Sequence, residues 1–143
     1  MPLSKILLGS FMLLTTAVSP VSAYEGEASY GRDIRLPECD SFAVLGDIAA
    51  GFGHKERRFW DTGLSITGIE KIRETAWRPW SRNLIPRRFC TGIAIMSDGE
   101  KRAVTYSIRH RLGFLGMSWN VQWCVSGLDH NYGYGAECRA ARP

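Results

Sequence analysis

The chain has 143 residues, of which 45% are hydrophobic and 22% charged, and a formal net charge of +4. The 120 residues that follow a predicted signal peptide are enough for one domain with a hydrophobic core but not for two. They contain no apolar stretch long enough to span a bilayer, so we expect a soluble product without a transmembrane segment.

The first 23 residues have the order of a secretory signal peptide. Lys5 supplies a positive charge, the apolar run Ile6–Val18 follows, Pro20 breaks it, and small residues lead up to Ala23. A membrane anchor is the alternative, but a bilayer core requires about 20 apolar residues and this run is shorter. No cysteine lies near the cleavage site, which argues against a lipid anchor. We therefore predict cleavage after Ala23 and a periplasmic or secreted product.

The segment 24–38 is polar and has no periodicity, so it is expected to be an irregular lead-in. A single domain is predicted over 39–143. A helix is expected to start near Asp40 or Ser41, either of which can cap its first turn. Its apolar face is predicted from spacing, and the helix can continue as far as Trp60. The residues assigned to that face are Phe42, Leu45, Ile48, Ala49 and Phe52.

Strands are predicted after Gly63 from β-branched, aromatic and alternating residues, at 64–67, 69–77, 89–96, 102–109 and 117–125. Asp98-Gly99 between two apolar runs is a hairpin signal. A loop is expected over 78–86, which contains two prolines. One helix followed by a four-stranded antiparallel meander gives an α+β fold, with the helix on one face of the sheet.

This order of elements resembles the cystatin-like layout, in which a sheet wraps one long helix. The chain has no loop of the Gln-Val-Val-Ala-Gly type by which cystatins enter protease clefts, so protease inhibition is not implied. The signal peptide and the segments 85–90 (Ile-Pro-Arg-Arg-Phe-Cys) and 123–129 (Trp-Cys-Val-Ser-Gly-Leu-Asp) are similar to those of small exported proteins of Gram-negative bacteria. That resemblance implies export from the cytoplasm but does not imply any particular activity.

The exported part contains four cysteines, an even number that predicts two disulfides. They are Cys39, Cys90, Cys124 and Cys138. Metal binding is the alternative, but there is no Cys-x-x-Cys pair and no suitably placed histidine. Three connectivities are possible. We favour Cys39 with Cys90, which would pin the helix start to the sheet, and Cys124 with Cys138, which would tie the tail to a strand.

Positive charge is concentrated in one segment. Residues 24–77 contain ten acidic and seven basic residues, whereas 78–111 contain eight basic and two acidic ones. Tryptophan and arginine side chains together suit a binding surface for a protein or an anionic envelope polymer. The candidate residues are Trp77, Arg78, Trp80, Arg82, Arg87 and Arg88. The alternative is a solvated segment that pairs with the acidic half or folds its tryptophans over the sheet edge. Nucleic acid is not expected as a partner, because no binding motif is present.

The sequence contains no recognisable catalytic motif, neither a Gly-x-Ser-x-Gly elbow nor a His-Glu-x-x-His pair. The three histidines, His54, His110 and His130, have no evident nucleophile beside them. No cofactor or metal is expected. The leading hypothesis is a non-catalytic periplasmic or cell-envelope binding protein. A secreted effector or inhibitor that acts on a host or competitor, and a small hydrolase, are the alternatives.

Overall fold

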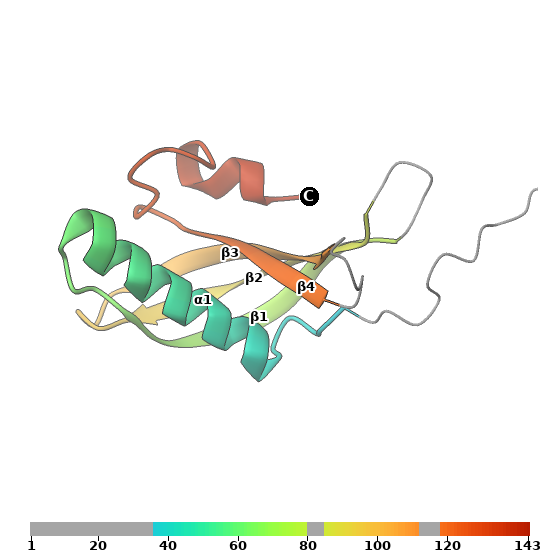
Figure 1. Cartoon of the computed structure of the whole chain (residues 1–143), viewed down its shortest axis with the longest axis horizontal. Coiled ribbons are helices and arrows are strands. Elements are labelled where there is room, and N and C mark those ends of the chain that lie inside the picture. The colour runs from blue at the N-terminus through green and yellow to red at the C-terminus, as the bar shows by residue number, and fades with distance from the viewer. Residues whose placement is uncertain (1–35, 80–84, 112–117) are drawn as a thin grey trace, which may run out of the picture. The chain divides into compact units, whose positions relative to one another are not determined.

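The computed structural model describes residues 36–79, 85–111 and 118–143. The predicted signal peptide, most of the lead-in, Trp80 and Arg82 lie outside the described residues. The described part is α+β, with one α-helix and a four-stranded antiparallel sheet (Figure 1). Its elements are α1 (Phe42–Lys55), the π-helix η1 (Glu56–Trp60), β1 (Ile66–Arg78), β2 (Arg87–Met96), β3 (Lys101–Arg111), β4 (Ser118–Val125) and the 3-10 helix η2 (Ala136–Ala141).

The helix begins after Ser41, whose carbonyl accepts a hydrogen bond from the Leu45 amide at 3.0 Å. The predicted side-chain cap is not formed, because the Ser41 side chain makes no bond to the first turn. The buried stripe consists of Val44, Ile48 and Phe52. The continuation of the helix as far as Trp60 is confirmed, as η1.

The assignment of Phe42 to the core face is wrong, because its side chain is 91% exposed. Two residues along an α-helix correspond to a rotation of about 200°. Phe42 therefore lies on nearly the opposite side of α1 from Val44, which is fully buried.

The sheet is a meander with the strand order β1-β2-β3-β4, and each neighbouring pair is antiparallel. The two predicted segments at 64–67 and 69–77 form the single strand β1, whose pairing with β2 contains three irregularities. The hairpin at Asp98-Gly99 is confirmed. The Gly99 amide donates to the Met96 carbonyl at 3.0 Å, and the φ angle of +84° at Gly99 is one that glycine adopts without strain.

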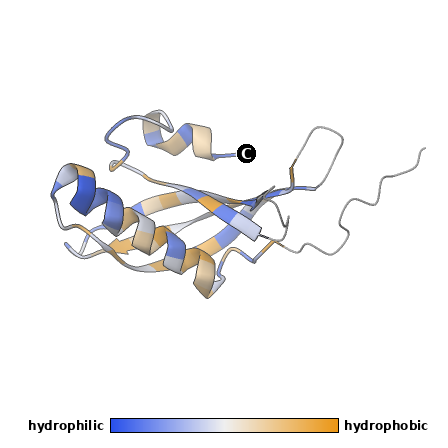
Figure 2. Ribbon diagram, viewed as in Figure 1, coloured by the Kyte–Doolittle hydropathy of each residue, from blue (hydrophilic) through white to orange (hydrophobic). Residues whose placement is uncertain are grey.

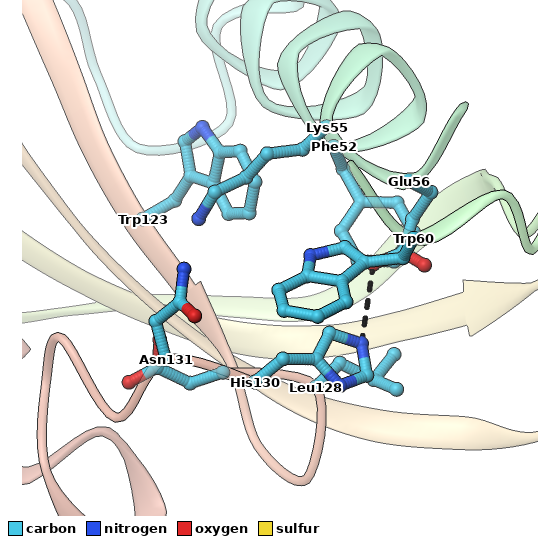
Figure 3. Close-up of a pocket in the computed structure, with 9 residues that line it drawn as sticks. Phe52, Lys55, Glu56, Trp60, Trp123, Leu128, His130 and Asn131 are labelled. Carbon is cyan, nitrogen blue, oxygen red and sulfur yellow. Dashed lines mark ion pairs between the residues drawn. The ribbon is translucent and has the colours of Figure 1, made fainter. Parts of the chain in front are cut away.

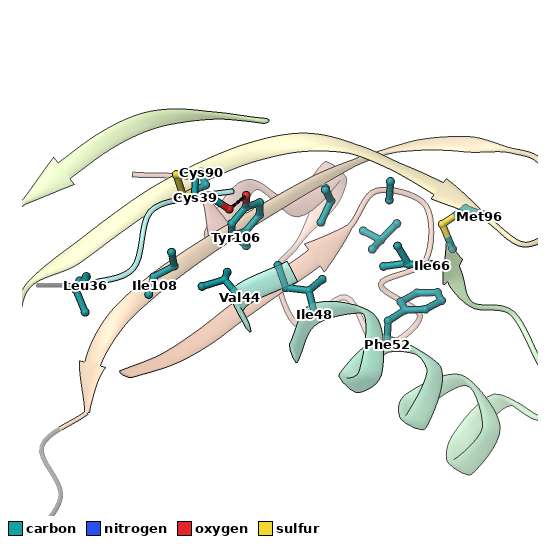
Figure 4. Packing of buried hydrophobic residues seen from close by; sticks show 13 residues of the cluster. Leu36, Cys39, Val44, Ile48, Phe52, Ile66, Cys90, Met96, Tyr106 and Ile108 are labelled. Carbon is teal, nitrogen blue, oxygen red and sulfur yellow. Dashed lines mark hydrogen bonds between the residues drawn. A yellow bond between two sulfur atoms is a disulfide. The ribbon is translucent and has the colours of Figure 1, made fainter. Parts of the chain in front are cut away.

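The core lies between α1 and one face of the sheet (Figure 4). Every second residue of β2 and β3 faces the helix, as the predicted alternation requires, and Figure 2 shows hydrophobic residues alternating with hydrophilic ones along the strands. The strand residues buried there are Cys90, Ala94, Met96, Val104, Tyr106, Ile108 and Val125. The Tyr106 hydroxyl donates to the Cys39 carbonyl at 2.7 Å, which satisfies a buried polar group.

The other face of the sheet is partly covered by the C-terminal segment. In Figure 1, α1 and η2 lie on opposite sides of the sheet. Cys138 and Ala141 of η2 pack with Cys124 of β4, and Tyr134 lies against them. Thr105, which faces away from α1, is therefore also buried.

Both disulfides have the predicted pairing. Cys39–Cys90 joins the residues before α1 to β2, and Cys124–Cys138 joins β4 to η2. Such bonds are compatible with a periplasmic or extracellular protein. Within the described residues, none of the helices has the length and apolar character needed to cross a membrane.

Candidate functional site

The predicted binding residues lie mainly on strand ends rather than in a loop. Trp77 and Arg78 end β1, and Arg87 and Arg88 begin β2. The expectation that Arg78 belongs to the loop 78–86 is wrong, because Arg78 pairs with Arg87 in the antiparallel ladder, next to the pair of Trp77 and Arg88. Trp80 is outside the described residues, as is Arg82. Since side chains alternate between the faces of a strand, the four described residues divide into two pairs.

Trp77 and Arg88 form the pair on the side of the sheet that faces α1. The Arg88 guanidinium lies 5.3 Å from the Trp77 ring centroid. It also forms ion pairs with Glu38 and, at 2.6 Å, with Glu74. The charge of Arg88 is therefore balanced by two carboxylates from the acidic half of the chain. This is the pairing that the alternative interpretation of the basic segment predicted.

Arg78 and Arg87 lie on the opposite face, in line with a third arginine. Cross-strand pairing places Arg78 opposite Arg87 and Arg87 opposite Arg109 of β3. Residues directly opposite each other in a sheet point to the same face. We call Arg78, Arg87 and Arg109 the arginine row. Asn120 of β4 is opposite Arg109 and continues the line across the sheet.

Phe89 provides an aromatic support under the arginine row. Its side chain is only 3% exposed, and the guanidinium carbons of Arg78 and Arg87 lie 5.3 Å and 5.7 Å from its ring centroid. Such cation–π contacts hold a guanidinium flat against a ring. At the other end of the row, Arg109 Nε donates to Asn120 Oδ1 at 3.1 Å. These contacts orient the arginines without neutralising them.

The arginine row is an unbalanced concentration of positive charge. Within the part of the chain that the structure describes, none of its three guanidiniums has a carboxylate in ion-pairing distance. Burial, and then the charges of Arg109 and Arg78, lower the pKa of Arg87. Like charges directly opposite each other in a sheet destabilise the fold. An anion placed over the row would remove that repulsion and meet several N–H donors.

The C-terminal loop borders the arginine row. Burial and the nearby Asp129 carboxylate raise the pKa of the Tyr134 hydroxyl, and Arg109 opposes them with a smaller effect. The Tyr134 amide donates to Asp129 Oδ2 at 2.7 Å, which fixes the loop. This arrangement places Arg109 within electrostatic range of the loop that precedes η2.

Sequence reasoning did not select Arg109 or Asn120 for this surface. The relevant signal was the alternation along β3, which assigns Val104, Tyr106 and Ile108 to the core and therefore Arg109 to the opposite face. The register of the hairpin at Asp98-Gly99 then places Arg109 opposite Arg87.

A second polar cluster lies where η1 meets the loop after β4 (Figure 3). The Glu56 carboxylate is buried, accepts a hydrogen bond from the Thr62 hydroxyl at 2.5 Å, and lies 3.6 Å from His130 Nε2. Trp60 packs on His130 with ring centroids 4.5 Å apart. The free volume of this hollow is about 10 Å³, which is room for roughly one water molecule. It is too small to hold an organic substrate.

The remaining histidines do not join this cluster. His54 is exposed near the end of α1, and His110 is buried in β3. Among residues 36–79, 85–111 and 118–143, no three side chains of the metal-binding types gather at one point. The arginine row is therefore the best-supported candidate for a functional site.

Comparisons with known proteins returned no match: no family model, no curated protein and no solved structure is similar to this chain.

Proposed function

We propose that this chain is a non-catalytic, exported protein of the bacterial cell envelope that binds an anionic partner through the arginine row. The observation that carries the proposal is the alignment of Arg78, Arg87 and Arg109 on three adjacent strands, where none of them has a carboxylate in ion-pairing distance among the described residues. Guanidinium groups recognise carboxylate and phosphate groups through paired N–H donors. The helix and the four-stranded sheet serve in this proposal as a rigid support.

Export is part of the proposal and rests on two features. The first 23 residues have the order of a signal peptide, and the four cysteines pair as two disulfides. Disulfides form and persist in oxidising compartments such as the periplasm. Cell fractionation tests this step: the processed protein is expected in the periplasmic or secreted fraction with Tyr24 as its first residue. Recovery of the unprocessed chain from the cytoplasm would contradict it.

Anion binding is tested with the intact processed protein on isolated cell envelopes at low and high salt. Wild type is expected to associate at low salt and to be released as salt rises, because exposed charge contacts are screened beyond about 10 Å at 0.1 M salt. The double variant Arg87→Gln/Arg109→Gln should bind less and show a weaker salt dependence. Arg58→Gln is the matched control, since Arg58 is an exposed arginine of η1 outside the row. Equal binding by wild type and the double variant would refute the role of the row.

A further inference from the structure

The arginine row differs from a site for a single small anion in its shape. Neighbouring strands lie about 4.8 Å apart, so the backbone positions of the three arginines form a line of roughly 10 Å. The guanidiniums of Arg78 and Arg87 both contact the Phe89 ring of β2, whereas that of Arg109 reaches towards Asn120 of β4. The three guanidiniums are therefore spread along the row and do not all converge on one point, as donors do around a phosphate ion.

From this shape we infer that the ligand of the row is an acidic polysaccharide whose successive carboxylates lie across the strands, one to each arginine. This inference rests on the proposed function and adds its substrate class. A polymer that carries one carboxylate per sugar presents anions in a line, which is the arrangement that the row can neutralise. Binding then removes the repulsion between neighbouring arginines and gives each of them a charge-assisted hydrogen bond.

Neutral polar groups beside the row suit the hydroxyl groups of a sugar. Asn120 continues the row itself, and its amide nitrogen is a donor while its oxygen accepts from Arg109. Gln122 lies two residues further along β4, and Ser107 is opposite it in the register. Ser107 is itself opposite Phe89. Ser107 is buried, so the groups that this face offers to a ligand are guanidiniums and amides.

A membrane surface fits this face less well. Peripheral membrane binding combines charge with apolar side chains that enter the lipid. The large apolar side chain under the row, Phe89, is buried beneath two arginines. Of the exposed apolar side chains, Phe42 and Phe59 belong to α1 and η1. Trp77 lies on the face of β1 opposite the row, and Ile85 precedes β2 as a single exposed residue.

Titration calorimetry at low salt with the processed wild-type protein tests the inference. The probes are galacturonic acid, its dimer, trimer and hexamer, an uncharged glucose oligomer, inorganic phosphate, and vesicles that contain phosphatidylglycerol. The association constant is expected to rise about three- to fivefold with each added charged sugar up to the trimer, because each sugar adds one exposed ion pair. Beyond the trimer it should level off, because the row contains three arginines. The uncharged oligomer should not bind measurably.

Variants locate the binding on the row. Arg87→Gln removes the central cation and should reduce the association constant of the trimer by at least the same factor, while Arg58→Gln leaves it unchanged. Arg87→Lys keeps the charge and loses the planar pair of donors, so its affinity should fall between those of wild type and Arg87→Gln. Thermal unfolding checks that each variant is folded. Arg78→Gln, at an exposed position, replaces Arg87→Gln if that variant does not fold.

The outcomes separate the two proposals. Affinity that is equal for monomer and trimer, tighter binding of inorganic phosphate, or binding of vesicles alone would overturn the polysaccharide inference and leave anion binding intact. The inference would equally be overturned by trimer binding that all arginine-row variants retain. No binding of any anionic probe by the folded wild-type protein would overturn the proposed function as well.

Discussion

Replacing Cys39 and Cys90 together by alanine should destabilise the domain more than replacing Cys124 and Cys138. The two disulfides close loops of very different length, with sequence separations of 51 and 14 residues. A disulfide stabilises a fold chiefly by restricting the unfolded chain, and the restriction grows with the logarithm of the loop length. The two bonds therefore contribute about 4.1 and 3.0 kcal/mol on this model.

The comparison is informative because the two pairs are otherwise alike. All four cysteines are buried, so each double variant removes two buried sulfur atoms and leaves similar small cavities. That shared loss cancels in the difference between the variants. The difference that remains, about 1 kcal/mol, reports loop length.

Urea unfolding of the processed protein under non-oxidising, non-reducing conditions measures both losses. With a urea dependence of about 1.5 kcal/mol per molar, the midpoint should fall by roughly 2.7 M without Cys39–Cys90 and by roughly 2 M without Cys124–Cys138. A larger loss from the short loop would refute the reasoning from chain entropy. It would indicate that the packing of η2 on β4 contributes more than the closure of the long loop.

Three further predictions concern the core. Burial raises the pKa of Tyr106, so the stability that its neutral hydroxyl contributes is complete below the unfolded pKa of about 10 and is lost as pH rises above it. Tyr106→Phe should therefore flatten the alkaline branch of a stability–pH curve while costing about 1–2 kcal/mol at pH 7, since the Cys39 carbonyl loses its donor. If the alkaline branch of Tyr106→Phe is unchanged, the loss of stability at high pH is caused by another group. Gly92→Ala should cost about 1–3 kcal/mol in urea unfolding, because its new Cβ would lie 3.0 Å from a β1 side chain, whereas Gly46→Ala in open space on α1 should be neutral or stabilising. Equal effects of the two glycine substitutions would contradict that contact. Leu36→Ala should lower the thermal midpoint and cost about 2–5 kcal/mol, since Leu36 is buried in the core, and a change below 1 kcal/mol would show that this side chain does not pack there.

The sequence was sufficient for the elements that depend on local pattern. Alternation along 102–109 and 117–125 predicts β3 and β4, and Asp98-Gly99 predicts the hairpin between β2 and β3. The cysteine pairing also followed from the expected positions of the helix, the strands and the tail. The strands and the hairpin are encoded by residues that lie close together or recur at a fixed period, whereas the pairing of Cys39 with Cys90 spans 51 residues and followed from the order of the elements.

The features that the sequence did not predict depend on contacts between distant segments. Arg88 pairs with Glu38, fifty residues earlier, and nothing in the local sequence distinguishes it from Arg87 beside it. The arginine row exists only through the register of three strands, and a change of one residue in that register would turn each side chain to the other face. Phe42 was misplaced because a helical stripe through Leu45 and Ile48 can begin at either Phe42 or Val44, and only packing against the sheet selects Val44.

The irregular pairing of β1 has a consequence for how copies of this protein meet one another. In the described sheet, β1 is an edge strand of 13 residues with only β2 beside it. A straight edge of that length would accept a strand from a second molecule and start a fibre. The positive φ of Lys71 and the register shift between Glu70 and Arg73 interrupt this edge, and the exposed side chains of Lys71 and Arg73 add charge beside the interruption. We expect this edge to keep neighbouring molecules apart at high local concentration, so that an array of copies along a polymer would remain dispersed.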